Sequence, residues 1–516
     1  MCKSFKRIGE KTLHMEVPGV YRKSENRILL PHEFFLPFEG RLNENNRWCQ
    51  LALLIPWSQI EDEYAKLFKP VSNGGETAVS IRMALGALLI QEKLGTSDRD
   101  TVENITENPY MQYMIGLPGF QQQPPFDPSL MTHFRKRLGP DVLNQINEWI
   151  IMAKNEAEQD NDNQDPKGGP GGTMAVQEED TSREASPEPV LRQGKLLLDA
   201  TCAPADIAYP TDLSLLNEAR EKLEHIIDAL HAPHRGQMGK PRTYREKARR
   251  AYLVITKQRR ANGRKIRKGI GQQLRYIARD LRILEQLAQI TPLTVLSRKD
   301  YKNLLVIQEL VRQQKQMYGQ RTHRVDDRIV SISQPHVRPI VRGKAKAPVE
   351  FGAKIAVSMV DGDARVEQLQ WDNFNEGLTL QEAVEAYRER YGFYPEAVLA
   401  DKLYRTRDNL QYCQGLGIRL SGPKLGRPAK GEQTTHKRIE RQDAAERNAI
   451  EGKFGEGKRK YGLGLIRARL QQTSASVIML QILVMNLERR LRLLFVIILS
   501  LLQNTFRPIN ATFFTI

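Results

Sequence analysis

Two short apolar segments, far apart in the chain, each run directly into an aspartate. The first, residues 196–201, reads LLLDAT and is soon followed by Pro204, and the second, residues 397–401, reads AVLAD. Apolar runs of this length that are closed by a polar residue are typical of strands buried on both faces of a sheet. In α/β sheets, chemistry collects at the carboxyl ends of strands. If the two strands are neighbours, Asp199 and Asp401 should face each other at that edge.

The chain around the second segment continues to alternate strands and helices. Residues 353–360 form a further apolar run, Asp361-Gly362 supplies a two-residue hairpin turn, and residues 365–371 give the return strand. A helical pattern follows at 380–391, and the segment from about 444 to 503 is mostly helical. Strands interspersed with helices in this way predict a mixed α/β sheet.

A basic helical segment interrupts the predicted sheet after its first strand. Apolar residues keep the helical period in three stretches between 213 and 325, which predicts an antiparallel helical insert. Within it, residues 235–279 hold sixteen Lys or Arg and one acid, Glu246, for a net charge of +15. A charge run is usually a solvated helix face, but this density is hard to hold together without a polyanion, so we favour contact with nucleic acid. The candidate contacts in the insert are Arg249, Arg250, Arg259, Arg260, Arg264, Lys265, Arg267 and Lys268.

The N-terminal third of the chain is predicted to be helical. Residues 46–154 have helical character, Ser97-Asp98-Arg99 has the pattern of a cap and first turn, and Asp127-Pro128-Ser129 precedes a helix with the basic run Arg135-Lys136-Arg137. A compact helical domain with a basic last helix is either a helix-turn-helix DNA reader or a plain bundle, and the two interpretations stay level. Residues 155–190, which hold ten acids, two bases and the sequence PKGGPGG, predict a flexible linker.

The composition bounds the class of protein. A chain of 516 residues is longer than one core usually organises, and 40% apolar with 27% charged residues excludes a mostly disordered protein. The net charge of +17 indicates a polyanionic partner, either nucleic acid or an anionic membrane. The longest apolar run, residues 493–502, falls short of the roughly 20 residues that a spanning helix needs, so a membrane role is not expected.

Cysteine usage and the first residues bear on the compartment. The sequence opens without the apolar core of a secretory signal, and its cysteines lie far apart with no C-x-x-C spacing. A disulfide framework and a cysteine–zinc site are both unexpected, and a reducing, cytoplasmic location fits. The cysteines are Cys2, Cys49, Cys202 and Cys413.

A third carboxylate has suitable neighbours in the C-terminal helical segment. Arg447, Glu451, Phe454 and Lys458 are spaced four, three and four residues apart, so they share one stripe of one helix. Phe454 would seat this stripe against the sheet, and Glu451 would then point toward the strand ends. Three converging carboxylates can hold two Mg²⁺ (or Mn²⁺) ions about 3.5–4 Å apart, the arrangement that cleaves or transfers phosphodiesters. Arg447 and Lys458 would clamp DNA phosphates beside the metals.

Each of these observations also has a simpler explanation. Hairpin chemistry fully explains Asp361 and Asp363, and an Arg–Glu–Lys stripe also occurs on exposed, salt-bridged helices. The nine histidines form no H-x-x-x-H pair, which argues against a zinc hydrolase, and the lack of a Walker-type G-x-x-x-x-G-K-[ST] loop argues against an ATPase. Four further carboxylates rival the chosen three, namely Asp206, Asp212, Asp326 and Asp327.

The helix stripe resembles a known family signature. Arg447-x₃-Glu451-x₆-Lys458, followed by Tyr461-Gly462-Leu463, is similar to the C-terminal signature of bacterial insertion-sequence DDE transposases of families four and five. The tyrosine that stands three residues before the arginine in the fuller signature is Ala444 here. A flap contact by a tyrosine is therefore not expected, whereas metal binding does not depend on it.

Other segments resemble motifs of the same family. Residues 198–201 (LDAT) and 399–404 (LADKLY) are similar to its first and second acid motifs, and the stretch 97–138 resembles the InsH-type domain that precedes its catalytic part. The resemblance covers roughly residues 30–490. It implies an RNase H-like catalytic fold, Mg²⁺-dependent cleavage of the element's ends and strand transfer to target DNA, usually by a homodimer with both ends bound. The acids that it implies are Asp199, Asp401 and Glu451.

The expected organisation follows from these segments. Double-stranded DNA, as the terminal inverted repeats of an element and as its target, is the expected partner, in the bacterial cytoplasm or nucleoid. The expected parts are a helical N-terminal domain (1–154), an acidic Gly/Pro linker (155–190), an RNase H-like catalytic domain (191–490) with a basic helical insert (213–325), and a C-terminal apolar helix end and tail (491–516).

Several alternatives stay open. The basic, proline-containing segment 337–344 places Arg338 and Arg342 either along DNA near the active site or in an ordinary connection into the next strand. A nuclease or resolvase of the same fold group would hydrolyse DNA without strand transfer. A non-enzymatic DNA-binding protein, or a decayed copy that represses transposition, is kept open by the unusual tail 505–514. An RNA-binding role has only charge in its favour.

Overall fold

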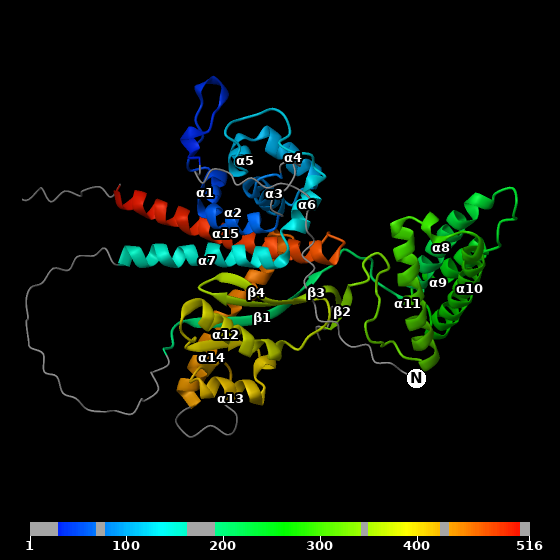
Figure 1. Cartoon of the computed structure of the whole chain (residues 1–516). Helices are drawn as coiled ribbons and strands as arrows, with labels where there is room; N and C mark the ends of the chain where they lie inside the picture. The colour runs from blue at the N-terminus through cyan, green and yellow to red at the C-terminus, as the bar shows by residue number, and fades with distance from the viewer. Residues whose placement is uncertain (1–28, 69–77, 163–190, 342–348, 424–432, 506–516) are drawn as a thin grey trace, which may run out of the picture.

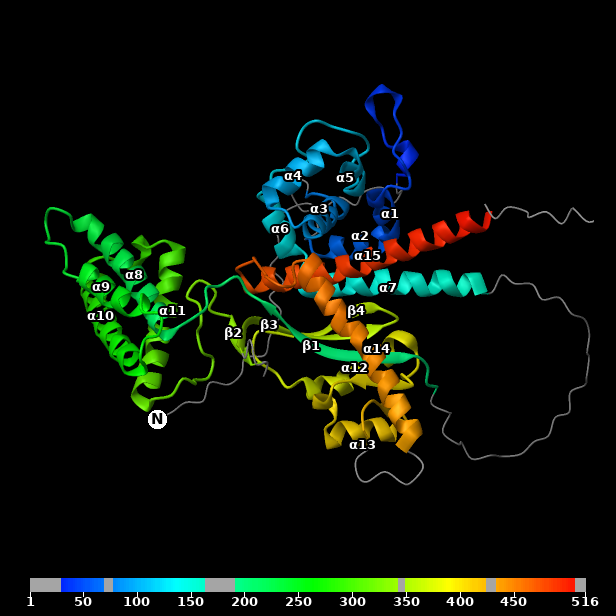
Figure 2. The same ribbon diagram turned by 180° about the vertical axis from the view of Figure 1, so that it is seen from behind.

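The computed structural model describes residues 29–68, 78–162, 191–341, 349–423 and 433–505 (Figure 1). Most of the predicted acidic linker, Arg342 and the tail beyond residue 505 lie outside the described residues. The arrangement has a central sheet with helices on both faces and a separate helical lobe to one side (Figures 1 and 2).

The central sheet is mixed, as the sequence predicts. β1 pairs antiparallel with β3 and parallel with β5, and β5 pairs parallel with β6. The other edge of β3 pairs antiparallel with β2 and with β4. The hairpin between β3 and β4 turns at Asp361 and Gly362, whose φ values of 49° and 83° suit a tight two-residue turn. The described strands are β1 (Lys195–Pro204), β2 (Arg338–Val341), β3 (Val349–Val360), β4 (Asp363–Gln370), β5 (Ala397–Ala400) and β6 (Arg419–Leu420).

Helices from the N-terminal third pack above one face of this sheet. Ser97 caps α4 as predicted, because its hydroxyl accepts a hydrogen bond from the Asp100 backbone N–H at 3.2 Å. The last of these helices, α7, continues past residue 154 to Asp162. These elements are η1 (Pro31–Glu33), η2 (Pro37–Glu39), α1 (Arg47–Leu54), α2 (Trp57–Lys66), α3 (Ile81–Leu94), α4 (Asp98–Glu107), α5 (Pro109–Met114), α6 (Leu130–Arg137) and α7 (Pro140–Asp162).

The C-terminal helices complete the layers on the sheet. α7 and α15 (Gln471–Thr505) lie together on one face, and α12 (Leu380–Tyr391) and α13 (Arg407–Gly415) lie on the other (Figures 1 and 2). One continuous apolar core joins the N-terminal helices, one face of the sheet and α15. A second, smaller core fills the space between the sheet and the α12 layer. α14 (Gln433–Lys460) contacts β1 and β5.

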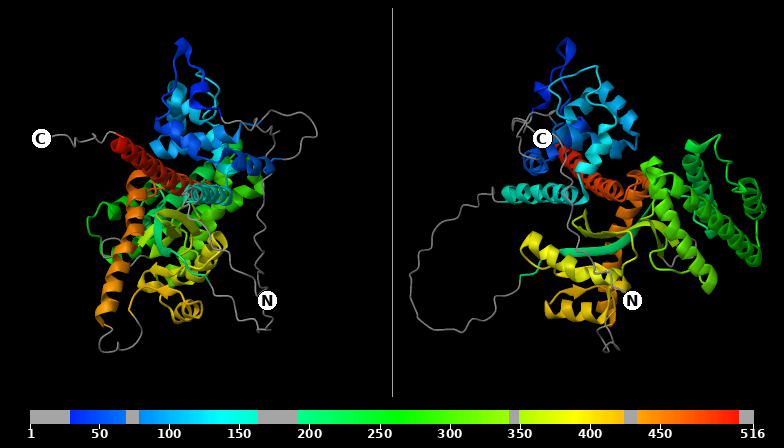
Figure 3. Two further views of the ribbon diagram at one scale, coloured as in Figure 1. Left: turned by 90° about the vertical axis from the view of Figure 1, so that its left-hand side faces the viewer. Right: turned by 45° about the vertical axis from the view of Figure 1, so that its right-hand side comes forward.

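The predicted helical insert forms the separate lobe (Figure 3). It has an apolar core of its own, separate from the two cores that pack on the faces of the sheet. The basic stretch of the insert forms an additional helix, α9, that apolar periodicity alone did not predict. Within the described residues, no helix is both long enough and apolar enough to cross a membrane. The elements of the insert are α8 (Asp212–His231), η3 (Ala232–His234), α9 (Arg245–Thr256), α10 (Gly263–Ile290), η4 (Leu293–Val295) and α11 (Arg298–Gln320).

Candidate active site

The pairing of β1 with β5 brings two of the predicted acids together. The two strands are parallel neighbours, and Leu198 opposite Ala400 is the last pair in their register. The residues that follow this pair are Asp199 and Asp401. The two strands are thus neighbours, which is the condition under which the sequence places Asp199 and Asp401 at one edge.

Asp199 nevertheless does not end its strand. β1 continues to Pro204 because its other edge stays paired with β3 as far as Gly352, which lies opposite Pro204. Asp199 lies opposite Val357, and only the pairing with β5 stops before it. The prediction of a strand that ends in aspartate was right for β5 and wrong for β1, since a carboxylate does not stop a strand whose other edge remains hydrogen-bonded.

α14 carries the third predicted acid to the same edge of the sheet. Ile450 and Phe454 are buried and seat this helix, whereas the Glu451 side chain is 52% exposed. Arg447 forms an ion pair with Glu451 at 3.0 Å. The helical spacing correctly predicted that Arg447, Glu451, Phe454 and Lys458 share a face, because all four line one pocket.

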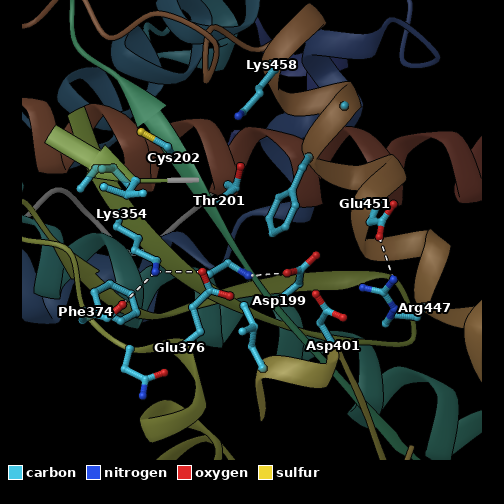
Figure 4. A pocket seen from close by; sticks show the side chains of 17 residues that line it. Asp199, Thr201, Cys202, Lys354, Phe374, Glu376, Asp401, Arg447, Glu451 and Lys458 are labelled. Carbon is cyan, nitrogen blue, oxygen red and sulfur yellow. Dashed lines mark hydrogen bonds and ion pairs between the residues drawn. The ribbon is translucent and has the colours of Figure 1, made fainter. Parts of the chain in front are cut away.

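Asp199, Asp401 and Glu451 line this pocket together, from three different elements (Figure 4). Burial raises the pKa of the Asp199 carboxyl to about 6, and the nearby carboxylates of Glu376 and Glu451 contribute to that rise. The Ala200 backbone N–H donates to Asp199 Oδ1 at 2.8 Å, which opposes it. Asp401 caps the short helix η6 (Lys402–Tyr404) by accepting from the Lys402 backbone N–H at 2.6 Å.

Sequence reasoning missed two charged residues of the pocket. Lys354 on β3 and Glu376, the first residue of η5 (Glu376–Thr379), line it and form an ion pair at 2.8 Å. The signal for Lys354 was a single charge inside the apolar run 353–360. Glu376 lies in the mostly polar stretch 372–377, where no period or neighbouring motif distinguishes it.

The oxygen ligands of the pocket are of the kind that a hard divalent cation prefers, but their present positions suit such an ion less well. Carboxylate oxygens are the ligands that Mg²⁺ prefers. Among the described residues, however, no three His, Cys, Asp or Glu side chains are grouped closely enough to hold a metal ion. Glu451 is engaged by Arg447 and Glu376 by Lys354. Glu376 already lines the pocket beside Asp199, so the residues fit such an ion if the half-exposed Glu451 side chain turns from Arg447 toward them.

The predicted DNA contacts of the insert lie elsewhere in the molecule. Arg249 and Arg250 are exposed on α9, and further exposed cations lie before and at the start of α10. Arg267 is the exception, because it is half-buried and its guanidinium stacks on the Tyr318 ring, 4.2 Å from the ring centroid. None of the insert residues lines the carboxylate pocket. The exposed candidates in the loop after α9 and in the first turns of α10 are Arg259, Arg260, Arg264, Lys265 and Lys268.

The segment before β3 places only one of its two predicted contacts within the described residues. Arg338 is largely buried on β2, with a side chain 20% exposed, and pairs with Asp372 at 3.4 Å. Its neighbours Ile340 and Val341 line the pocket, but Arg338 itself does not.

The rival carboxylates are separate from the pocket. Asp212 pairs with Arg328 at 2.7 Å at the base of the insert. Neither Asp212 nor any of the other three lines the carboxylate pocket. Those three, all exposed, are Asp206, Asp326 and Asp327.

The sequence of this chain matches two known protein families and one known protein. Residues 36–137 match a family described as "Transposase domain (DUF772)", and residues 398–488, which include Asp401 and the α14 stripe, match one described as "Transposase DDE domain". The chain is 30% identical over 182 residues to an uncharacterized protein, ORF8 in the nfe locus of Rhizobium meliloti, and the match covers 35% of this chain and 73% of that protein. No solved structure matches.

These matches and the mixed α/β fold define a class, the transposases. More specifically, the chain belongs to the insertion-sequence family of DDE transposases. Membership implies transposition of a mobile element with DNA as the partner, and a divalent metal is the usual cofactor of the family.

Proposed function

We propose that this transposase cuts the ends of its element and joins them to target DNA through Asp199, Asp401 and Glu451. The observation that carries the proposal is the convergence of these acids on one pocket from β1, the end of β5 and α14. Asp199 is buried beside the other acids and is costly to keep charged, which makes the pocket a candidate for function.

Each residue of the pocket would have a distinct task. Asp199, Asp401 and Glu451 would hold one or two Mg²⁺ or Mn²⁺ ions. Such ions, when bound, supply a nucleophile from water or a 3′-hydroxyl and stabilise the leaving oxygen. Arg447 and Lys458, which line the same pocket, would bind DNA phosphates and orient the strand.

The proposed catalytic domain, residues 191–490, would be RNase H-like. The strand order supports this proposal, because β1 lies between the antiparallel β3–β4 hairpin and the parallel β5–β6 pair. Both acid-bearing strands are then central neighbours, and α14 supplies the third acid from outside the sheet.

We further propose that the DNA extends beyond the pocket. The exposed cations of α9 and the start of α10 would bind backbone phosphates of the terminal inverted repeats or of target DNA. The helical N-terminal domain would add a second DNA contact, and the active complex would be a homodimer that holds both ends.

The test uses purified full-length protein and a labelled DNA fragment with the sequences that flank the gene. In Mg²⁺, wild type should give discrete cuts and joined products, whereas Glu451→Gln should give neither and still bind the fragment. Cuts without joined products would indicate a nuclease that does not transfer strands. Binding without cutting by both proteins would indicate a repressor or an inactive copy.

A further inference from the structure

A fourth carboxylate lines the pocket of the proposed catalytic acids. Glu376 begins η5, and its side chain is 18% exposed. Figure 4 shows its carboxylate between the Lys354 ammonium and Asp199. Glu376 thus faces the proposed catalytic acids rather than open solvent.

The backbone around Glu376 is held against η6, the short helix that Asp401 caps. The Asn375 side chain accepts from the Gly377 backbone N–H at 3.1 Å. The buried Asn409 side-chain amide donates to Gly377 O at 2.6 Å and to Tyr404 O at 2.8 Å, which ties η5 to η6. A Cβ on Gly377 would lie 2.8 Å from Leu403 O, so the two short helices approach as closely as glycine allows.

The ion pair between Lys354 and Glu376 is not required to satisfy the lysine. The Lys354 ammonium already donates to Phe374 O at 2.8 Å and to Asn373 Oδ1 at 3.2 Å. Among the described residues, Glu376 has no ion pair other than the one with Lys354. A carboxylate has about four lone-pair sites, so Glu376 keeps oxygen donors that could face a second cation.

We propose that Glu376 is a fourth acid of the active site that would help to hold the divalent cation, and that Lys354 is a positioning residue that keeps its carboxylate in the pocket beforehand. This inference rests on the proposed function, because it uses the same metal site. It differs from a purely structural tie between β3 and η5, which would affect folding but not metal affinity.

The test measures Mn²⁺ binding to the full-length protein without DNA, by calorimetric titration and by the electron paramagnetic resonance signal of free Mn²⁺. Glu376→Gln, which still accepts a hydrogen bond from Lys354, should weaken Mn²⁺ binding about tenfold or more. The matched control is Glu382→Gln, an exposed glutamate on α12 that does not line the pocket and should bind like wild type. If Glu376→Gln does not fold, Glu376→Asp, which keeps the charge on a shorter stem, should also bind Mn²⁺ more weakly.

Asp199→Asn, titrated in parallel, separates this inference from the function on which it rests. Weak binding in both Asp199→Asn and Glu376→Gln supports the fourth acid. Weak binding in Asp199→Asn with wild-type binding in Glu376→Gln overturns the inference and leaves the metal site of the proposed function intact. Wild-type binding in Asp199→Asn, or no binding by the wild-type protein, overturns both.

Discussion

At the scale of single residues, the charges of the pocket lower the stability of the folded protein. Four acids line it beside Lys354, Arg447 and Lys458. Burial and neighbouring carboxylates together raise the pKa of Asp199 to about 6, which means that the folded protein disfavours the charged form. An ordinary core position would carry a neutral residue here. A cation bound as proposed would offset this cost.

Because the folded protein disfavours a charged Asp199, we predict that Asp199→Asn is more stable than wild type. The folded-state pKa of about 6 lies above the ordinary value of 3.8, so the folded state holds a proton that the unfolded state releases, and stability falls as the pH rises between these values. The full difference corresponds to roughly 3 kcal/mol. We expect the metal-free variant to be more stable than wild type by about 1–2 kcal/mol near pH 8, since asparagine weakens the Ala200 hydrogen bond.

Urea unfolding with EDTA, near pH 8 and again near pH 4, measures this gain. The difference should shrink toward zero near pH 4, where the folded state holds Asp199 protonated and the unfolded state has begun to take up the same proton. In a separate assay with Mg²⁺ near pH 8, Asp199→Asn should not cut the DNA that wild type cuts. Asp326→Asn, at an exposed position, is the control and should not change stability. Equal stability of Asp199→Asn and wild type near pH 8 would contradict the electrostatic argument.

At the scale of elements, much of the site could be predicted from local patterns. The run 397–401, the Asp361-Gly362 turn and the stripe from Arg447 to Lys458 each depend on residues that are close in sequence, and all three appear as expected. The true end of β1 could not be predicted, because it depends on pairing with β3, which lies about 150 residues further along the chain. Glu376 was missed for the same reason, since its place follows from packing of η5 on η6.

The close approach of β1 and β3 yields a test at this scale. A Cβ on Gly352 would lie 2.1 Å from Ala203 O and 2.8 Å from Pro204 Cα, both in the backbone of β1. Gly352→Ala should therefore force the strands apart and cost about 2–3 kcal/mol of unfolding free energy. Gly415→Ala, where a Cβ meets nothing within 4 Å, should cost much less. Thermal unfolding of both variants measures the difference, and equal costs would show that β1 and β3 are not packed this closely.

At the scale of the whole molecule, the basic insert is spatially separate from the carboxylate pocket. Its exposed cations should bind further phosphates without affecting metal binding. Replacing four of them with glutamine should weaken binding to a non-specific duplex and reduce the slope of log affinity against log salt by roughly 0.9 for each phosphate that the variant no longer neutralises. The four positions are Arg259, Arg260, Arg264 and Lys265.

Fluorescence anisotropy across a salt series measures that slope. A control variant with four exposed cations outside this patch changed to glutamine should keep the wild-type slope. The control positions are Arg298, Lys299, Arg388 and Arg407. The same slope for both variants would mean that these four cations act only through the net charge of the protein.

The continuous core that includes the N-terminal helices and the separate core of the insert predict opposite results for removing these two parts. Asn486 on α15 donates to Asn147 Oδ1 at 2.9 Å and to Ala364 O at 2.7 Å, and Glu148 pairs with the buried Arg365 at 2.9 Å. These contacts lie within the continuous core that joins α7, β4 and α15. A chain that begins at residue 191 would expose this core, so it should lose cooperative thermal unfolding and aggregate.

The insert should be dispensable for folding, because it has its own core and its two connections to the sheet meet at one place. Gln334 Nε2 donates to Asp206 O at 3.1 Å, and Asp212 pairs with Arg328 at 2.7 Å, so a short Gly-Ser linker can replace residues 213–325. This shortened chain should unfold cooperatively and bind Mn²⁺ like wild type, but bind DNA more weakly. Two results would contradict this prediction. One is cooperative unfolding of the chain that begins at residue 191, and the other is aggregation of the chain that lacks the insert.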